Sequence, residues 1–235
     1  MNKLKDIKQI SFYSAIFLSI LIFISCATNK KKSSDDFTEA PLFGMVYDYD
    51  NRPCSEALII IDDNEEAMSD INGRFIISVL SRGNHIVTAK KEGYETLSFS
   101  FSFLNRTQVL YLRMISFHQL LVEIENAIEK REWDKVESLN KRAEEIKKDD
   151  LIQQYLMAVY LNERGHPEDA VRILLDIIKH GLDEPVIYLT VGDIYQYKLN
   201  NTPEALKYID KYLELESDRE VRKRYDMLKE EIDSF

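Results

Sequence analysis

Hydrophobic positions in the C-terminal half of the chain recur with a fixed long period. Aligned segments place Val136, Ala170 and Ala205 in register, and the spacings between them are 34 and 35 residues. The same spacings separate a second set of positions, Ala143, Ile177 and Tyr212. A period of this length, built of paired amphipathic helices, is typical of a helical solenoid. The sequence therefore predicts an all-α stack of helix hairpins, with a capping helix at its end, over residues 115–235.

Between residues 42 and 114 the pattern changes to short apolar runs separated by turn residues. In the clearest run, Leu97 to Phe103, four apolar residues alternate with three serines. This period of two predicts a strand with one buried face. About six such runs follow one another at regular spacing, between turns such as Asp70 to Gly73. We therefore expect a small β-sandwich over residues 42–114, and an α+β protein of two folded parts.

The first forty-one residues resemble neither part. Three lysines within the first eight residues precede an apolar run from Ile10 to Ile24, which Ser25 and Cys26 follow. A basic start, about fifteen apolar residues and a small residue before a cleavage site describe a secretory signal. The run is shorter than the ~20 residues that span a bilayer comfortably. Residues 27–41 are polar and charged without periodicity, so we expect a flexible tether there.

The residues around Cys26 resemble the lipobox of bacterial lipoproteins. Ser25 fits the position before the cysteine, whereas Phe23 and Ile24 differ from the residues usual there. The resemblance implies a signal peptide at residues 1–25 and a lipidated Cys26, palmitate included, at the start of the tether at 26–41. Several acyl chains on one cysteine give stable membrane anchoring.

The alternative is an uncleaved signal anchor in which Cys26 has no role. In both interpretations the rest of the chain faces outward from a membrane of the bacterial cell envelope. Its place at the inner or outer membrane, on the periplasmic or surface face, stays open.

A second resemblance covers about seventy residues of the middle segment, which are similar to carboxypeptidase regulatory-like (transthyretin-like) and PEGA domains. The matching features are Gly44, the turn 50–53, Asp70, Asn72, Gly73, Phe75, Gly83, Gly93 and Tyr94. The resemblance implies an accessory module without chemistry of its own. Cys54 departs from the leucine usual in these domains, and we interpret it as a half-buried packing thiol.

The helical segments resemble tetratricopeptide repeats (TPRs), with a degenerate first repeat. Small residues such as Ala158, Ala170 and Gly192 stand where two helices must cross closely. The resemblance implies a concave face, lined by the first helix of each hairpin, that binds peptides or protein segments. Carried over by register, the partner-binding residues are Glu125, Glu129, Tyr155, Asn162, Glu163, Asp193, Gln196 and Tyr197.

The charge of the chain narrows the choice of partner. The net charge is −10, and residues 115–235 alone carry −9. Such a body repels phosphate backbones, which argues against nucleic-acid binding. Because the charged residues of the predicted concave face are all carboxylates, a basic or mixed aromatic protein segment is the partner that fits it. The alternative is that these charges are a solvated helix face.

The sequence contains few candidate catalytic or metal-binding residues. The four histidines (His85, His118, His166 and His180) show no metal-ligand spacing, and the two cysteines build no disulfide framework or metal site. Phosphate-binding loops and nucleophile motifs are absent from the sequence. We therefore predict no catalytic residue, metal or cofactor, and a protein that is not an enzyme.

Two functions remain at this point. The first is a non-catalytic, lipid-anchored envelope protein whose repeats act as a protein–protein interaction scaffold. The second is a structural or glycan-binding envelope lipoprotein, in which the β-domain contacts peptidoglycan and the repeats serve self-association. A sugar site needs exposed aromatic side chains, and the single tryptophan lies in the repeats.

Overall fold

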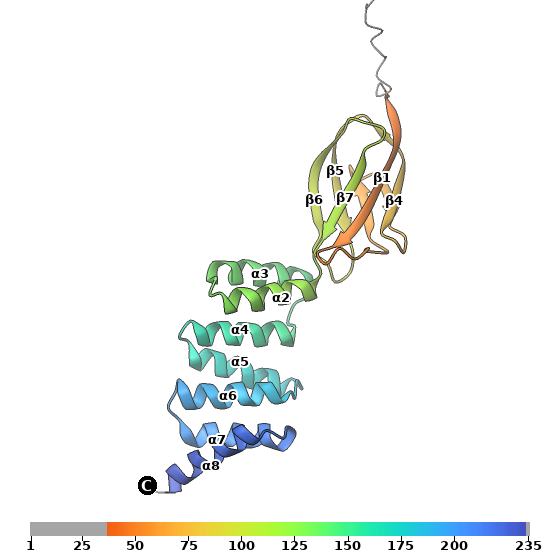
Figure 1. Cartoon of the computed structure of the whole chain (residues 1–235). Coiled ribbons are helices and arrows are strands. Elements are labelled where there is room, and N and C mark those ends of the chain that lie inside the picture. The colour runs from red at the N-terminus through yellow and green to blue at the C-terminus, as the bar shows by residue number, and fades with distance from the viewer. Residues whose placement is uncertain (1–36, 234–235) are drawn as a thin grey trace, which may run out of the picture.

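The computed structural model describes residues 37–233. A β-domain lies at one end, and helices stack away from it in chain order (Figure 1). The predicted signal peptide, Cys26 and most of the predicted tether lie outside the described residues. Within 37–233, none of the helices combines the length and apolarity needed to cross a membrane.

The β-domain consists of two sheets. Its strands are β1 (Glu39–Asp48), β2 (Leu58–Ile61), β3 (Glu65–Met68), β4 (Arg74–Ser81), β5 (Gly83–Lys90), β6 (Leu97–Phe103) and β7 (Val109–Met114). One sheet has the order β4-β1-β7 and the other the order β3-β2-β5-β6. The long strand β1 is the centre of the first sheet, antiparallel to β4 and parallel to β7.

The two sheets enclose one apolar core. Leu42 from β1, Ile59 and Ile61 from β2 and Phe103 from β6 are all fully buried in it. In β1 buried and more exposed positions alternate, as expected for a strand with one face on a core. The prediction of a two-sheet β-domain is therefore confirmed. Its first strand begins at Glu39, three residues earlier than the expected start of the β-domain.

Two details differ from the sequence prediction. Strand β3 was not predicted, because "EEAM" is a polar edge strand without a period of two. The strand over Leu97 to Phe103 is confirmed, but its expected buried face is only partly covered. Phe103 is fully buried, whereas Phe99 keeps 37% of its surface exposed. The reason is that β6 is an edge strand, which pairs with β5 alone.

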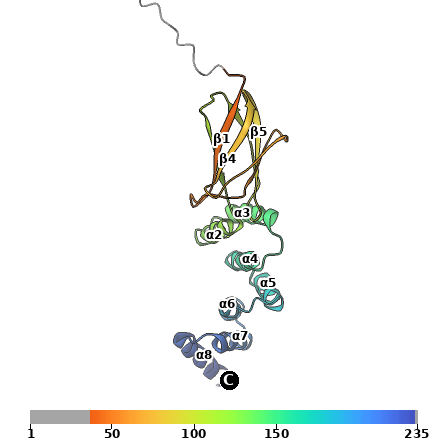
Figure 2. The same cartoon turned by 90° about the vertical axis from the view of Figure 1, so that its right-hand side faces the viewer.

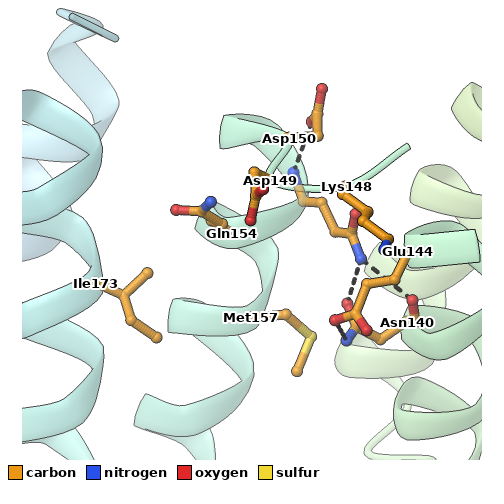
Figure 3. A pocket seen from close by; sticks show the side chains of 9 residues that line it. Asn140, Glu144, Lys148, Asp149, Asp150, Gln154, Met157 and Ile173 are labelled. Carbon is orange, nitrogen blue, oxygen red and sulfur yellow. Dashed lines mark hydrogen bonds between the residues drawn. The ribbon is translucent and has the colours of Figure 1, made fainter. Parts of the chain in front are cut away.

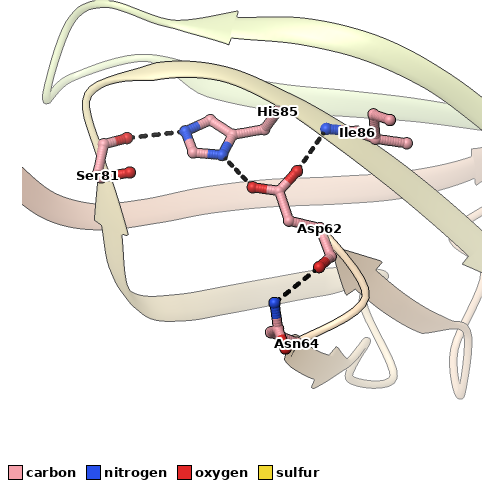
Figure 4. Close-up of polar contacts among 5 residues, drawn as sticks. All are labelled: Asp62, Asn64, Ser81, His85 and Ile86. Atoms are coloured by element: carbon pink, nitrogen blue, oxygen red, sulfur yellow. Dashed lines mark hydrogen bonds and ion pairs between the residues drawn. The ribbon is translucent and has the colours of Figure 1, made fainter.

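A buried histidine ties the turn after β2 to strand β5 (Figure 4). Nδ1 of His85 lies 2.6 Å from Oδ2 of Asp62, and Nε2 lies 2.8 Å from the carbonyl oxygen of Ser81. Since a carbonyl oxygen only accepts hydrogen bonds, Nε2 is the donor in the second contact. The backbone N–H of Ile86 donates to Oδ1 of Asp62 at 2.8 Å. These contacts use both oxygens of the carboxylate.

This contact predicts a pH dependence of β-domain stability. The hydrogen bond with His85, followed by that from Ile86, lowers the pKa of Asp62 below its ordinary value of 3.8. A lowered pKa in the folded state means that the contact stabilises above pH 3.8 and is lost as the pH falls through the folded pKa. Asp62→Asn should therefore reduce the melting temperature of the β-domain more at pH 6 than at pH 3, measured by scanning calorimetry. Asp63→Asn is the control for an exposed neighbour, and an equal deficit at both pH values would contradict the prediction.

Seven helices follow, and six of them form three hairpins. The helices are α2 (Phe117–Glu129), α3 (Trp133–Ile146), α4 (Leu151–Glu163), α5 (Pro167–Lys179), α6 (Pro185–Tyr197), α7 (Thr202–Leu215) and α8 (Arg219–Asp233). Ala158, Ala170 and Ala205 are fully buried, as expected of small residues where helices cross. The predicted hairpins and the last amphipathic helix are confirmed.

The junction between the β-domain and the repeats is short and is held by several hydrogen bonds and an ion pair. Ser116 caps α2 through a capping box with Gln119, only two residues after β7 ends. The backbone N–H of Glu95 donates to the carbonyl of Ile115 at 3.0 Å. The guanidinium of Arg142 on α3 binds both carboxylate oxygens of Glu95, at 2.8 and 2.7 Å. This two-bond contact joins the first hairpin directly to the β-domain.

Candidate functional site

The first helices of the three hairpins lie in one layer and the second helices in another (Figure 2). All eight predicted partner-binding residues are on the first helices. Two are on α2 (Glu125 and Glu129), three on α4 (Tyr155, Asn162 and Glu163) and three on α6 (Asp193, Gln196 and Tyr197). We call the surface that these eight side chains occupy the first-helix face.

The α2 part of this face carries two free carboxylates. Glu125 and Glu129 are exposed and lie four residues apart, hence on the same side of the helix. Neither side chain has an ion pair or hydrogen bond with another described residue. Glu163 on α4 differs, since its carboxylate lies 3.6 Å from the guanidinium of Arg131. The negative charge available to a partner therefore concentrates on α2.

The α4 part of the face contains a buried acceptor without a donor. Oδ1 of Asn162 is inaccessible to solvent and has no hydrogen-bond partner among residues 37–233. A buried, unsatisfied polar atom costs about 1–3 kcal/mol, so such atoms are rare in folded proteins. About two helical turns earlier on α4, the hydroxyl of Tyr155 lies 3.3 Å from that of Thr190 and links α4 to α6.

The α6 part of the face is occupied by the chain's own last helix. Nη2 of Arg224 on α8 donates to Oδ1 of Asp193 at 2.5 Å, and Nε donates to Oε1 of Gln196 at 2.7 Å. The guanidinium also lies 5.1 Å from the ring centre of Tyr197, a cation–π contact. The three predicted residues therefore contact a cation that belongs to this chain, the guanidinium of Arg224, and not a cation of a partner.

Sequence reasoning missed Arg224. The apolar stripe of α8 through Val221 and Leu228 predicted the buried side of the helix, and both residues are buried. Arg224 lies three residues after Val221 and four before Leu228, beside that stripe, which is the available signal. Its partners lie 28 and 31 residues away in the sequence. No local pattern links positions at that separation.

A groove lies on the other side of the repeats, between α3, α4 and α5 (Figure 3). Its volume is 540 Å³, and Met157 and Ile173 supply its apolar lining. Most of its polar groups bind one another. The side-chain amide of Gln153 donates to Asn140 Oδ1 at 2.8 Å, and Asp150 accepts from the first backbone N–H groups of α4. We interpret the groove as the packing gap between two hairpins, closed by a helix cap.

The cysteine that lies among the described residues is a core side chain. Cys54 is 2% exposed, and burial raises the pKa of its thiol. The prediction of a half-buried thiol was therefore wrong in degree, since Cys54 is a core residue and stays protonated at neutral pH. In the part of the chain that the structure describes, no three His, Cys, Asp or Glu residues are arranged to hold a metal ion.

Comparisons with known proteins give likenesses to helical-repeat structures. No family model matches the sequence, and no curated protein matches it. The first TPR domain of human RPAP3 is similar with 13% identity and a TM-score of 0.43, covering 50% of this chain and 93% of that domain. PcrH from Pseudomonas aeruginosa has 13% identity and a TM-score of 0.41, with 50% and 91% covered. The Sgt2 TPR domain from Aspergillus fumigatus has 17% identity and a TM-score of 0.43, with 50% and 79% covered. The three helix hairpins of the structure establish the helical-repeat architecture, and these likenesses do not carry it.

Proposed function

We propose that this protein is a non-catalytic, lipid-anchored scaffold of the bacterial envelope, which recruits a protein partner on the first-helix face. Cys26 is the lipidated residue in this proposal. The β-domain, taken as a carboxypeptidase regulatory-like or PEGA-like module, is the spacer between the anchor and the repeats. The partner presents a basic or mixed aromatic segment.

The pair of exposed carboxylates on α2, Glu125 and Glu129, is the observation that carries the scaffold role. Neither has an ionic or hydrogen-bonding partner among residues 37–233, so both are available to a partner. Two neighbouring carboxylates favour cationic side chains in an incoming segment. They describe a site for a protein segment that carries positive charge where it meets α2.

The arrangement of the chain supports the anchor. The sequence signal at Cys26 precedes β1, and β1 begins at the end of the β-domain that is remote from the helices (Figure 1). An anchor before β1 would therefore hold the repeats away from the membrane surface. Such a placement leaves the α2 and α4 parts of the first-helix face open to other envelope proteins.

A second candidate function has one specific observation in its favour. Tyr111 and Tyr49 in the β-domain are 65% and 49% exposed, and exposed aromatic rings are what a glycan site requires. In that case the β-domain would bind peptidoglycan, and the repeats would serve self-association. The aliphatic neighbours Ile76 and Val109 fit sugars poorly, so we place this candidate second.

Crosslinking and capture from envelope membranes test the proposal. Wild-type chain grown with a labelled palmitate is expected to carry the label and to recover one recurrent protein partner. Cys26→Ala is expected to lose the label, because the acylated thiol is gone. An unlabelled wild-type chain of full precursor mass would contradict the anchor. Recovery of glycan fragments alone, or of the chain itself alone, would contradict the scaffold role and favour the β-domain candidate.

A further inference from the structure

One end of the β-domain combines exposed apolar side chains with unpaired arginines. This end, which we call the apex, comprises the start of β1, the β4–β5 turn and the β6–β7 loop. The registers Glu39 with Ser81 and Gly83 with Phe103 bring these segments together. The backbone N–H of Arg82 also donates to the carbonyl of Thr38 at 2.9 Å.

Four large apolar side chains at or beside the apex are exposed. Val79 is 53% exposed, Leu104 52%, Phe43 47% and Val109 40%. Phe43 and Val109 are direct neighbours in the β1–β7 register, and Ile76 continues the row across β1 at 54% exposure. Ile76, Phe43 and Val109 thus form one contiguous exposed apolar row, and such a row marks an interaction surface.

Two unpaired cations stand at the apex, beside carboxylates of the neighbouring strand and turn. Arg82 and Arg106 are the charged residues of the β4–β5 turn and the β6–β7 loop, and both are exposed. Neither guanidinium has an ionic or hydrogen-bonding partner within residues 37–233. Glu39 is the carboxylate on the strand that begins there, and Asp62 of the β2–β3 turn reaches the same end through His85, which also contacts the Ser81 carbonyl. Residues 115–235 carry a net charge of −9. An anionic surface would thus attract these two guanidiniums and repel the repeats.

The position of the apex along the chain identifies its partner. Cys26 and Phe37 are separated by eleven residues, which span at most about 40 Å even when fully extended. In either interpretation of the N-terminal segment, a membrane tether ends at or before Cys26. The tether therefore enters the folded chain at the apex, through Phe37 and the start of β1.

From these observations we infer that the apex of the β-domain rests on the surface of an anionic phospholipid bilayer. Leu104, Val79, Phe43 and Val109 enter the interfacial region, and Arg82 and Arg106 contact lipid phosphates. The long axis of the molecule then points away from the membrane, with the first-helix face beyond the headgroups. This inference rests on the membrane tethering in the proposed function and adds a second, orienting contact. A second copy of the chain is the rival occupant.

Quenching of tryptophan fluorescence by brominated lipids tests the contact on the full chain in anionic vesicles. Trp133→Phe removes the native indole, and Leu104→Trp then introduces one at the apex. Met68→Trp is the matched control, because Met68 is 63% exposed at the opposite end of the same domain. We expect quenching at least about threefold stronger at position 104 than at position 68. Adding Arg82→Glu and Arg106→Glu should reduce it, as should raised salt.

The possible results of this experiment distinguish the apex contact from the membrane tether. Equal quenching at both positions in chains that float with the vesicles would overturn the apex contact and leave the tether intact. A shielded indole at position 104 without lipid quenching would assign the apex to a second copy and overturn the bilayer contact. Chains that do not float with the vesicles would overturn both the tether and the apex contact.

Discussion

Replacing Gly192 with leucine is expected to open the third hairpin. A Cβ atom at this position would lie 2.8 Å from Cγ1 of Ile209 and 3.4 Å from the carbonyl oxygen of Ala205, both on α7. A leucine places three further carbons in the same space, and overpacking of this kind costs about 1–3 kcal/mol or more. Because α8 packs on α7, its ordering should be lost with the hairpin.

Hydrogen exchange followed by mass spectrometry measures this effect. Peptides from residues 185–233 should exchange much faster in Gly192→Leu than in wild type, while those from residues 37–114 should not change. Val186→Leu, at a 52% exposed position of the same helix, is the control and should exchange as wild type. Unchanged protection of α6 and α7 in Gly192→Leu would show that the hairpins do not depend on this close crossing.

The repeats were predictable from sequence because their packing is local. Each hairpin buries a stripe that recurs every 34 or 35 residues, and small residues such as Ala158 and Ala205 stand at the crossings. The assignment of the eight candidate residues to the first helices came from the resemblance to tetratricopeptide repeats, carried over by register. What periodicity leaves out is which of these side chains are already bound within the chain.

The unpredicted features all depend on contacts between distant residues. The sequence alone suggests that Asp193 is a free carboxylate, but in the structure it forms an ion pair with Arg224 of α8. The Asn162 oxygen lacks a hydrogen-bond partner because of how all the surrounding elements are placed, so no sequence motif predicts it. In the β-domain, Phe99 looks buried by alternation, yet its strand is at the edge of a sheet.

Reversing the charge of Glu125 and Glu129 together is expected to abolish partner capture. Both carboxylates are exposed and free of partners among the described residues. Glu125→Lys with Glu129→Lys therefore reverses two charges without breaking a contact of the fold. A basic segment would then meet two repelling ammonium groups, which should weaken binding about tenfold or more. The same change at Glu163 or Asp193 would be ambiguous, because it also breaks the ion pairs with Arg131 and Arg224.

A matched control carries the same change of charge on the other layer of helices. Glu145 on α3 and Glu168 on α5 are exposed and have no ion pair or hydrogen bond with another side chain in the described range. Glu145→Lys with Glu168→Lys should leave partner capture at the wild-type level. Circular dichroism should report the same helix content for both double variants, which excludes unfolding as the cause of any loss.

The measurement that tests the scaffold role most directly is quantitative crosslinking capture from envelope membranes, with wild type and the two double variants side by side. The first-helix face predicts that the partner is recovered by wild type and by Glu145→Lys with Glu168→Lys, and is lost with Glu125→Lys and Glu129→Lys. Equal recovery by all three chains would contradict it and place the partner elsewhere on the molecule.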